Sequence, residues 1–165
     1  MRVPVYIVSG FLGSGKTTLI NQLRATPELS GTLVIVNEIG DVGIDGALFQ
    51  DGQGEARVLA DGCICCSLES ELTRTLQQLE QQRMRGELAY KRIVIETTGV
   101  ADPCPIVCRL QHNPAMKASF QLCGVLTVVD AARIAEQLLH GVEAAHQILA
   151  ADQVALSKLL DKQTR

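Results

Sequence analysis

The segment GFLGSGKT at residues 10–17 constrains this chain more than any other, because it matches the whole phosphate-binding pattern G-x-x-x-x-G-K-[ST]. The apolar residues 3–8 before it predict a buried parallel strand, and residues 18–23 after it predict an amphipathic helix. Strand, glycine-rich loop and helix therefore follow one another in the order that a phosphate-binding loop requires. A glycine-rich turn that matches the pattern by chance is the alternative, and the correct flanks disfavour it.

The residue types in this segment suit a nucleoside triphosphate. Glycines adopt backbone angles closed to other residues, and they let main-chain N–H groups surround a phosphate at a helix N-terminus. Lys16 would lie between the β- and γ-phosphates, and the Thr17 hydroxyl would take one ligand position on Mg²⁺. The nucleotide contacts expected in this segment are Gly10, Gly13, Ser14, Gly15, Lys16, Thr17 and Thr18.

A carboxylate follows a second predicted buried strand, at residues 91–95. Glu96 stands at the end of this strand, where the second element of a triphosphate site holds Mg²⁺ directly or through water. Gly99 would let the main chain approach the γ-phosphate. We therefore expect Glu96 to serve the Mg²⁺ shell and to act with Lys16 in catalysis. A strand that merely ends in an exposed glutamate is the alternative.

An acidic, glycine-punctuated loop follows the predicted strand at residues 32–36. Ligands of open α/β sheets gather at the carboxyl ends of the strands, so residues 37–45 are expected to face the phosphates and to act as a switch element. No general base stands out, and a water molecule positioned by Asp41 or Asp45 is the candidate nucleophile, with slow intrinsic turnover. A solvated acidic loop is the alternative.

Three thiols lie within four residues at Cys63, Cys65 and Cys66. Adjacent cysteines are poorly placed to bridge each other, and a thiolate just before a helix N-terminus is favoured by the helix dipole. Ser67 is expected to cap the helix predicted over residues 68–83, whose apolar stripe is Leu68, Leu72, Leu76 and Leu79.

Soft thiolates suit Zn²⁺ or Cu(I), and a carboxylate would complete a tetrahedral Zn²⁺ site. Glu38 or Asp41 could supply that carboxylate. A redox-active trio of cysteines is the main alternative, and inert thiols are another.

The remaining segments continue the alternation of strands and helices. A helix is expected from Pro105, a strand at residues 122–130, helices at 131–139 and 142–151, and a last strand from Val154. We expect Cys108 and Cys123 to be buried, and the histidines to lie on the surface. Together these segments predict an α/β P-loop NTPase fold, with a mostly parallel sheet flanked by helices on both faces.

Composition narrows the class of protein further. The chain has 165 residues, which fits one domain, and a net charge of −3 with 3% aromatic residues, which argues against nucleic-acid binding. No apolar run approaches the ~20 residues that span a bilayer, and no signal peptide is apparent. We therefore expect a cytoplasmic protein without a membrane partner. In that reducing compartment, the clustered cysteines favour metal or redox chemistry over disulfides.

The order of these motifs resembles the CobW-type family of metallochaperone GTPases. The segments that carry the resemblance are residues 10–17, Asn37-Glu38-x-Gly40, Gly62-Cys63-x-Cys65-Cys66, Glu96-x-x-Gly99 and Ala101-Asp102-Pro103. The resemblance implies a protein that binds and hydrolyses GTP with Mg²⁺, binds Zn²⁺ or a related metal such as Co²⁺, and hands it to a client metalloprotein. It implies metal ligation by Cys65, Cys66 and Glu38, with Cys63 as a further candidate.

Two features depart from the family pattern. Where the family reads guanine with Asn-Lys-x-Asp, this chain has Ser157-Lys158-Leu159-Leu160-Asp161, so Lys158 and Asp161 are expected to contact the base although the acid comes one residue late. Family members also continue beyond this length. The expected domain is residues 1–165, a P-loop GTPase domain truncated before its last strand and C-terminal domain, with a bare sheet edge that favours homo-oligomers.

Two other functions remain open from the residues alone. Phosphate-binding loops also serve small-molecule kinases, although the arginines here do not cluster as a kinase lid requires. The chain could also be a metal-storage or redox-sensing module that keeps a nucleotide only for stability.

Overall fold

Six parallel strands form one sheet in the computed structural model, which describes residues 1–37, 56–59 and 66–159 and the side chains of 1–36 and 72–159. The strand order is β3-β2-β4-β1-β5-β6. The strands are β1 (Val3–Ser9), β2 (Thr32–Asn37), β3 (Ala56–Leu59), β4 (Arg92–Thr97), β5 (Phe120–Asp130) and β6 (Gln153–Ser157). Because β1 lies between β4 and β5, the loop that follows it emerges from the interior of the sheet.

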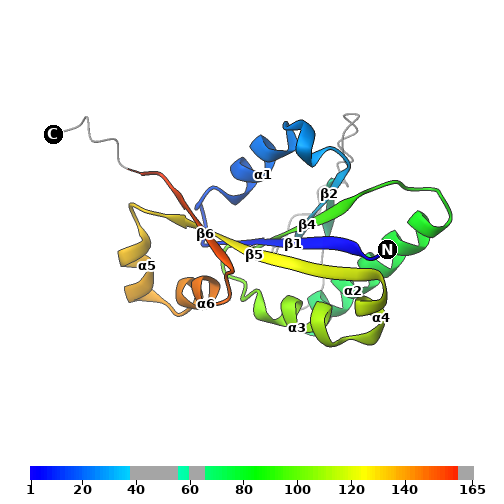
Figure 1. The fold of residues 1–165 in the computed structure, drawn as a ribbon. Helices are drawn as coiled ribbons and strands as arrows, with labels where there is room; N and C mark the ends of the chain where they lie inside the picture. Colours follow the sequence, from blue (N-terminus) through cyan, green and yellow to red (C-terminus); the bar gives the residue numbers. More distant parts are fainter. Residues whose placement is uncertain (38–55, 60–65, 160–165) are drawn as a thin grey trace.

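Helices cover both faces of this sheet (Figure 1). On one face lies α1 (Lys16–Arg24), followed by the short 3-10 helix η1 (Pro27–Leu29), and on the other lie α2 (Cys66–Met84), α3 (Cys104–His112) and α4 (Pro114–Ser119). The last two helices, α5 (Ile134–His140) and α6 (Glu143–Leu149), connect β5 to β6. The predicted α/β fold, with a parallel sheet between helical layers, is confirmed.

The larger apolar core lies between the sheet and α2, α3 and α4. Alternate strand residues point into it, and α2 contributes the predicted stripe positions Leu72, Leu76 and Leu79. A smaller cluster packs α1 against the opposite face, where Ile20 meets Val8, Val34 and Val128. The core thus holds β1 from both sides, which fixes the start of the phosphate-binding segment.

Two helix starts differ from the sequence-based expectation. Helix α4 was not predicted, and it begins because the Asn113 side chain accepts hydrogen bonds from the N–H groups of Ala115 and Met116 at 3.0 and 3.2 Å. Helix α2 begins at Cys66, so Ser67 lies in its first turn and not at the expected cap position.

The expectation that Cys108 and Cys123 are buried is wrong, because both thiols are exposed. Helix α3 buries Ile106 and Leu110, and Cys108 lies two residues from each, which turns it about 200° away from the core. Cys123 lies on the α1 side of β5, at a cavity. The histidines His112, His140 and His146 are exposed, as expected.

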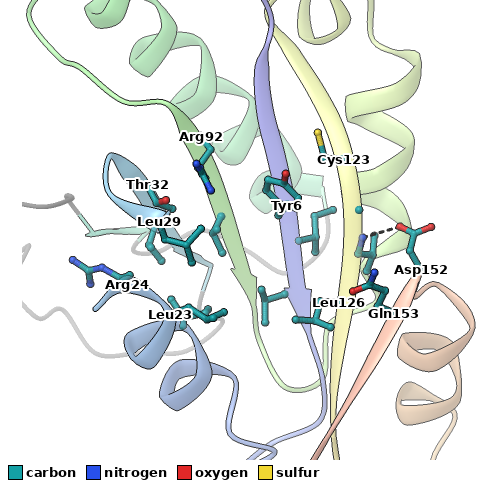
Figure 2. Close-up of a pocket in the computed structure, with 17 residues that line it drawn as sticks. Tyr6, Leu23, Arg24, Leu29, Thr32, Arg92, Cys123, Leu126, Asp152 and Gln153 are labelled. Atoms are coloured by element: carbon teal, nitrogen blue, oxygen red, sulfur yellow. Dashed lines mark hydrogen bonds between the residues drawn. The ribbon is translucent and has the colours of Figure 1, made fainter. Parts of the chain in front are cut away.

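The cavity beside Cys123 has a volume of about 370 Å³ and lies on the α1 face of the sheet (Figure 2). It is lined mainly by apolar side chains, among them Tyr6, Leu23, Leu29 and Leu126. None of the phosphate-loop glycines lines it. Within the described residues, no helix has the length and apolar character needed to cross a membrane.

Candidate nucleotide site

The loop between β1 and α1 adopts the backbone conformation that the sequence pattern requires. Gly10, Gly13 and Gly15 have φ angles of 140°, 69° and 99°, which L side chains rarely adopt. At Gly10 a Cβ would also lie 2.2 Å from the carbonyl oxygen of Val128. The glycines are therefore needed both for conformation and for the close passage of the loop over β5.

Lys16 is the first residue of α1 and is buried. Its Nζ donates hydrogen bonds to the carbonyl oxygens of Gly10 and Phe11 at 2.9 and 3.3 Å. The ammonium group thus lies across the start of the loop, against main-chain oxygens of the segment that should surround a phosphate. A point charge in this position can neutralise phosphate oxygens that enter the loop.

Thr17 and Glu96 lie together at the end of β4. The Thr17 hydroxyl donates a hydrogen bond of 2.5 Å to Oε1 of Glu96, and the Glu96 side chain is only 4% exposed. Its other oxygen, Oε2, is buried and has no hydrogen-bond partner among the described residues. A buried carboxylate oxygen without a partner, next to a hydroxyl, fits the oxygen ligands that Mg²⁺ prefers. The side chains of Thr17 and Glu96 therefore fit a Mg²⁺ ion.

Gly99 brings the turn after Glu96 against the phosphate loop. A Cβ at Gly99 would lie 2.5 Å from the main-chain N and 2.6 Å from the Cα of Leu12. Only a residue without a side chain can approach the loop this closely. The close neighbour is the main chain of Leu12, and the predicted approach of Gly99 to the γ-phosphate stays a prediction.

The end of β6 contacts the phosphate loop from the other side. The Ser157 hydroxyl donates to the carbonyl oxygen of Ser14 at 2.6 Å, and Lys158 Nζ donates to that of Gly13 at 2.7 Å. Lys158 Nζ also bonds Oδ2 of Asp130 at 2.8 Å, and this hydrogen bond holds the pKa of Asp130 below its ordinary value. Lys158 thus lies beside the phosphate loop, and its expected contact with the base stays a prediction, whereas sequence reasoning assigned no role to Ser157 or Asp130.

Gln147 is a further residue that sequence reasoning missed. It lies in α6 and is 1% exposed, and its Nε2 donates to the carbonyl oxygens of Gly99 and Ala101, both at 3.1 Å. Residues 142–151 predicted only a helix. A glutamine on the buried side of that helix is the signal that could have drawn attention to it, because a buried amide needs partners.

The carboxyl ends of strands β2, β3 and β4 lie side by side in the sheet. Asn37 at the end of β2 pairs with Leu59 of β3 on one side and with Thr97 of β4 on the other. The expected switch loop starts directly after Asn37, and the expected thiol segment starts after Leu59. Strand β2 thus ends beside β4, which carries Glu96, and β3 ends one strand further along the sheet.

Most of the predicted metal ligands lie outside the described residues, namely Glu38, Asp41, Cys63 and Cys65, as do Asp45 and Asp161. Cys66 is the first residue of α2, and its side chain is also outside the described part. Among the side chains that are described, no three His, Cys, Asp or Glu groups gather as a metal site would require. The metal ligands therefore stay predictions.

Comparison with known proteins places this site in a family. Residues 4–164 match the family model described as CobW/HypB/UreG, nucleotide-binding domain. The chain is 36% identical over 156 residues to the zinc chaperone YjiA of Escherichia coli. The aligned region is 94% of this chain and 49% of that protein. It is 35% identical over 138 residues to the zinc-regulated GTPase metalloprotein activator 1 of Schizosaccharomyces pombe. This aligned region is 80% of this chain and 33% of that protein.

Solved structures agree in fold. The crystal structure of Zn(II)-bound YjiA GTPase from E. coli matches with a TM-score of 0.72 and 29% identity, over 96% of this chain and 50% of that chain. The chain spans half or less of the length of these relatives. The match to the family model covers nearly every residue, and the chain belongs to the CobW/HypB/UreG family through its nucleotide-binding domain.

Proposed function

We propose that this protein is a GTP-binding and GTP-hydrolysing metallochaperone that carries Zn²⁺, or a related metal such as Co²⁺, to a client metalloprotein in the cytoplasm. The names of the relatives, a zinc chaperone and a zinc-regulated GTPase metalloprotein activator, support both halves of the proposal. The proposed domain assignment is one P-loop GTPase domain over residues 1–165.

The nucleotide half of the proposal assigns a role to the phosphate loop and to the residues around it. The main-chain N–H groups of residues 13–18 bind the phosphates, Lys16 neutralises their charge, and Lys158 with Asp161 faces the guanine base. Thr17 and Glu96 would hold Mg²⁺, which would supply positive charge beside the bound phosphates. The attacking water is oriented by Asp45 or Asp41, and the slow turnover expected of such an arrangement suits a switch better than a metabolic enzyme.

The metal half assigns Zn²⁺, as cargo, to Cys63, Cys65, Cys66 and Glu38, with Asp41 as a further oxygen ligand. Three thiolates and one carboxylate satisfy the tetrahedral preference of this ion. The proposal therefore predicts thiolate-dominated coordination, which is the type of site that binds zinc tightly and can release it when one ligand is withdrawn.

The observation that carries the proposal is the pairing of Asn37 with both Leu59 and Thr97. Strand β2, which leads into the proposed switch loop with Glu38, lies between two strands. On one side is β3, which leads to the thiols, and on the other is β4, which carries Glu96. A loop that responds to the γ-phosphate can then also change the coordination of the metal. Because linkage is reciprocal, the metal must change nucleotide affinity by the same factor.

The test is to measure Zn²⁺ affinity by competition with a chromophoric chelator, once with a non-hydrolysable GTP analogue and Mg²⁺ and once with GDP and Mg²⁺. Coupling between two sites is typically ~5- to 150-fold, so we expect a difference of at least about fivefold. Cys65→Ser should lower the affinity in both states and remove the difference. Equal Zn²⁺ affinity of the unsubstituted protein with both nucleotides would refute the coupling.

A further inference from the structure

Gln147 is a buried polar side chain that joins α6 to the turn after Glu96. The two hydrogen bonds from its Nε2 end on carbonyl oxygens of that turn, at Gly99 and Ala101. Its own main-chain oxygen accepts a 2.7 Å hydrogen bond from the hydroxyl of Thr127, which is itself 1% exposed on β5. Gln147 is therefore fixed at its backbone by the sheet, and its amide reaches the turn from a rigid base.

These hydrogen bonds determine how the turn is oriented. The turn closes with a bond from the Ala101 N–H to the Thr98 carbonyl at 3.2 Å. In a trans peptide the C=O and N–H groups point in opposite directions. Because the Gly99 carbonyl points to Gln147, the N–H of Val100 is directed away from α6. The amide thus sets the plane of this peptide next to Leu12, where Gly99 has no room to shift.

Helix α6, which carries Gln147, is followed by the strand whose end is hydrogen-bonded to the phosphate loop. From α6 the chain enters β6, at the end of which Ser157 and Lys158 bond the carbonyl oxygens of Ser14 and Gly13. In addition, Phe11 of the phosphate loop and Gln147 line the same small cavity. One segment, residues 147–158, therefore holds the turn after Glu96 and the phosphate loop in a fixed relation to each other.

Filling space between α6 and the turn would not by itself require an amide at position 147. Burying a polar side chain costs free energy unless it is hydrogen-bonded, and Oε1 of Gln147 has no partner among the described residues. An apolar side chain would avoid the unpaired Oε1, but it would leave the carbonyl oxygens of Gly99 and Ala101 without these two donors. What the amide adds is two donors directed at two carbonyl oxygens of the one turn that borders both Glu96 and the phosphate loop.

We propose that Gln147 is a positioning residue, which holds the turn at residues 98–101 in the orientation that meets the terminal phosphate and so favours a nucleoside triphosphate over a diphosphate. This inference rests on the proposed nucleotide function. It assigns Gln147 no contact with the nucleotide, since it acts through the main chain of Gly99 and Ala101.

The test compares Gln147→Met, which keeps the length of the side chain and removes both donors, with the unsubstituted protein. The affinities for a fluorescent non-hydrolysable GTP analogue and for the matching GDP derivative are measured with Mg²⁺ at a temperature where both proteins are folded. Loss of donors to buried carbonyls should lower affinity for the triphosphate about tenfold and change that for the diphosphate less than twofold. In Gln147→Asn the amide is withdrawn by one methylene group, so the ratio of triphosphate to diphosphate affinity should change in the same direction. This second variant keeps the test available if Gln147→Met does not fold.

The control is Met116→Ala, which removes a side chain of α4 from the larger apolar core, where Met116 is 1% exposed and has no recorded contact with the turn at residues 98–101 among the described residues. It should lower the thermal midpoint and leave the ratio of the two affinities unchanged. A ratio that is the same in the Gln147 variants and in the unsubstituted protein, or one that Met116→Ala shifts equally, would overturn the positioning role. If the unsubstituted protein binds neither nucleotide, the proposed function itself is wrong.

Discussion

The hydroxyl of Thr17 and the carboxylate of Glu96 lie in hydrogen-bond contact, although 79 residues separate them in the chain. This contact joins the first turn of α1 to the end of β4. It also leaves the second oxygen of Glu96 buried without a protein partner among the described residues, and so available to an ion.

Removing either member of this pair should weaken Mg²⁺-dependent nucleotide binding. Thr17→Ala deletes one oxygen ligand, and Glu96→Gln removes the charge, so each should lower GTP turnover by about 10- to 100-fold. Thr17→Ser keeps the hydroxyl and should retain most of the activity. The measurement is GTP hydrolysis against Mg²⁺ concentration. Turnover that stays within a factor of two in Thr17→Ala would contradict the assignment.

Gly99→Ala should disable the triphosphate site, because the new Cβ would lie within 2.6 Å of the main chain of Leu12. Main-chain atoms cannot rotate away as a flexible side chain can, so the turn and the phosphate loop must separate. A displacement of about 1 Å can cost about 100-fold in rate. The matched control is Gly124→Ala in β5, whose Cβ would meet the Asp152 carboxylate at an ordinary 3.5 Å. Equal hydrolysis rates for the two variants would show that the close contact has no catalytic role.

The pair Asp130–Lys158 predicts a stability effect with a definite dependence on pH. The hydrogen bond from Lys158 lowers the pKa of Asp130 in the folded protein below its ordinary value of 3.8. The ionised form is thus favoured by folding, and the stabilisation is complete above about pH 4 and lost as the pH falls through the folded-state pKa. Asp130→Asn should therefore be less stable than the unsubstituted protein at pH 7.

Thermal midpoints measured between pH 7 and pH 3 check this prediction. The difference between Asp130→Asn and the unsubstituted protein should shrink as the pH falls below 4. A difference that stays constant over the whole range would mean that the charge of Asp130 does not contribute to stability.

Metal binding should depend on the clustered thiols and not on those of α3. Cys65→Ser with Cys66→Ser should abolish the thiolate-to-metal absorbance of bound Co²⁺. The double variant Cys104→Ser, Cys108→Ser is the control, since both thiols are free and exposed, and desolvation together with Asp102 raises the pKa of Cys104 and disfavours its thiolate. It should bind Co²⁺ with unchanged stoichiometry. Loss of the Co²⁺ absorbance in this control alone would place the metal on α3.

Strand β6 should promote self-association of the 165-residue chain. Within the described residues it pairs only with β5, and its side chains Val154 and Leu156 are 47% and 58% exposed. An apolar edge strand is a template for another chain, and a lysine on it opposes pairing. Val154→Lys should reduce concentration-dependent association, whereas Met84→Lys at the end of α2 should not. Sedimentation velocity over a range of concentrations measures both, and a monomer at every concentration would refute the prediction.

Local sequence signals were sufficient for the fold, and they singled out Thr17 and Glu96, which the structure brings into contact. The glycine pattern, the β-branched runs and the carboxylate of Glu96 each act within a few residues of chain, and the strand–loop–helix order left few alternative arrangements. The same local signal singled out Gly99, although its close contact with Leu12 was not predicted.

Contacts that depend on strand order could not be predicted in this way. The bonds from Ser157 to Ser14 and from Gln147 to Gly99 arise because β6 packs beside β5 and α6 packs over the end of the sheet. Nothing near these residues in the sequence encodes that neighbourhood. The expected burial of Cys108 failed for a related reason, since cysteine is hydrophobic enough for either side of a helix and its neighbours decide which side faces the core.

The central place of β1 has a consequence for the synthesis of the protein. The phosphate loop is translated first, yet β1 pairs with residues 93–96 and 120–127, and the bond from Ser157 to Ser14 can form only after β6 has been made. Parallel pairing between such distant segments forms slowly, and nascent chains expose apolar surface until it forms. A ribosome-bound chain that stops before β5 should consequently be unable to retain GTP, even though it already carries the whole binding motif.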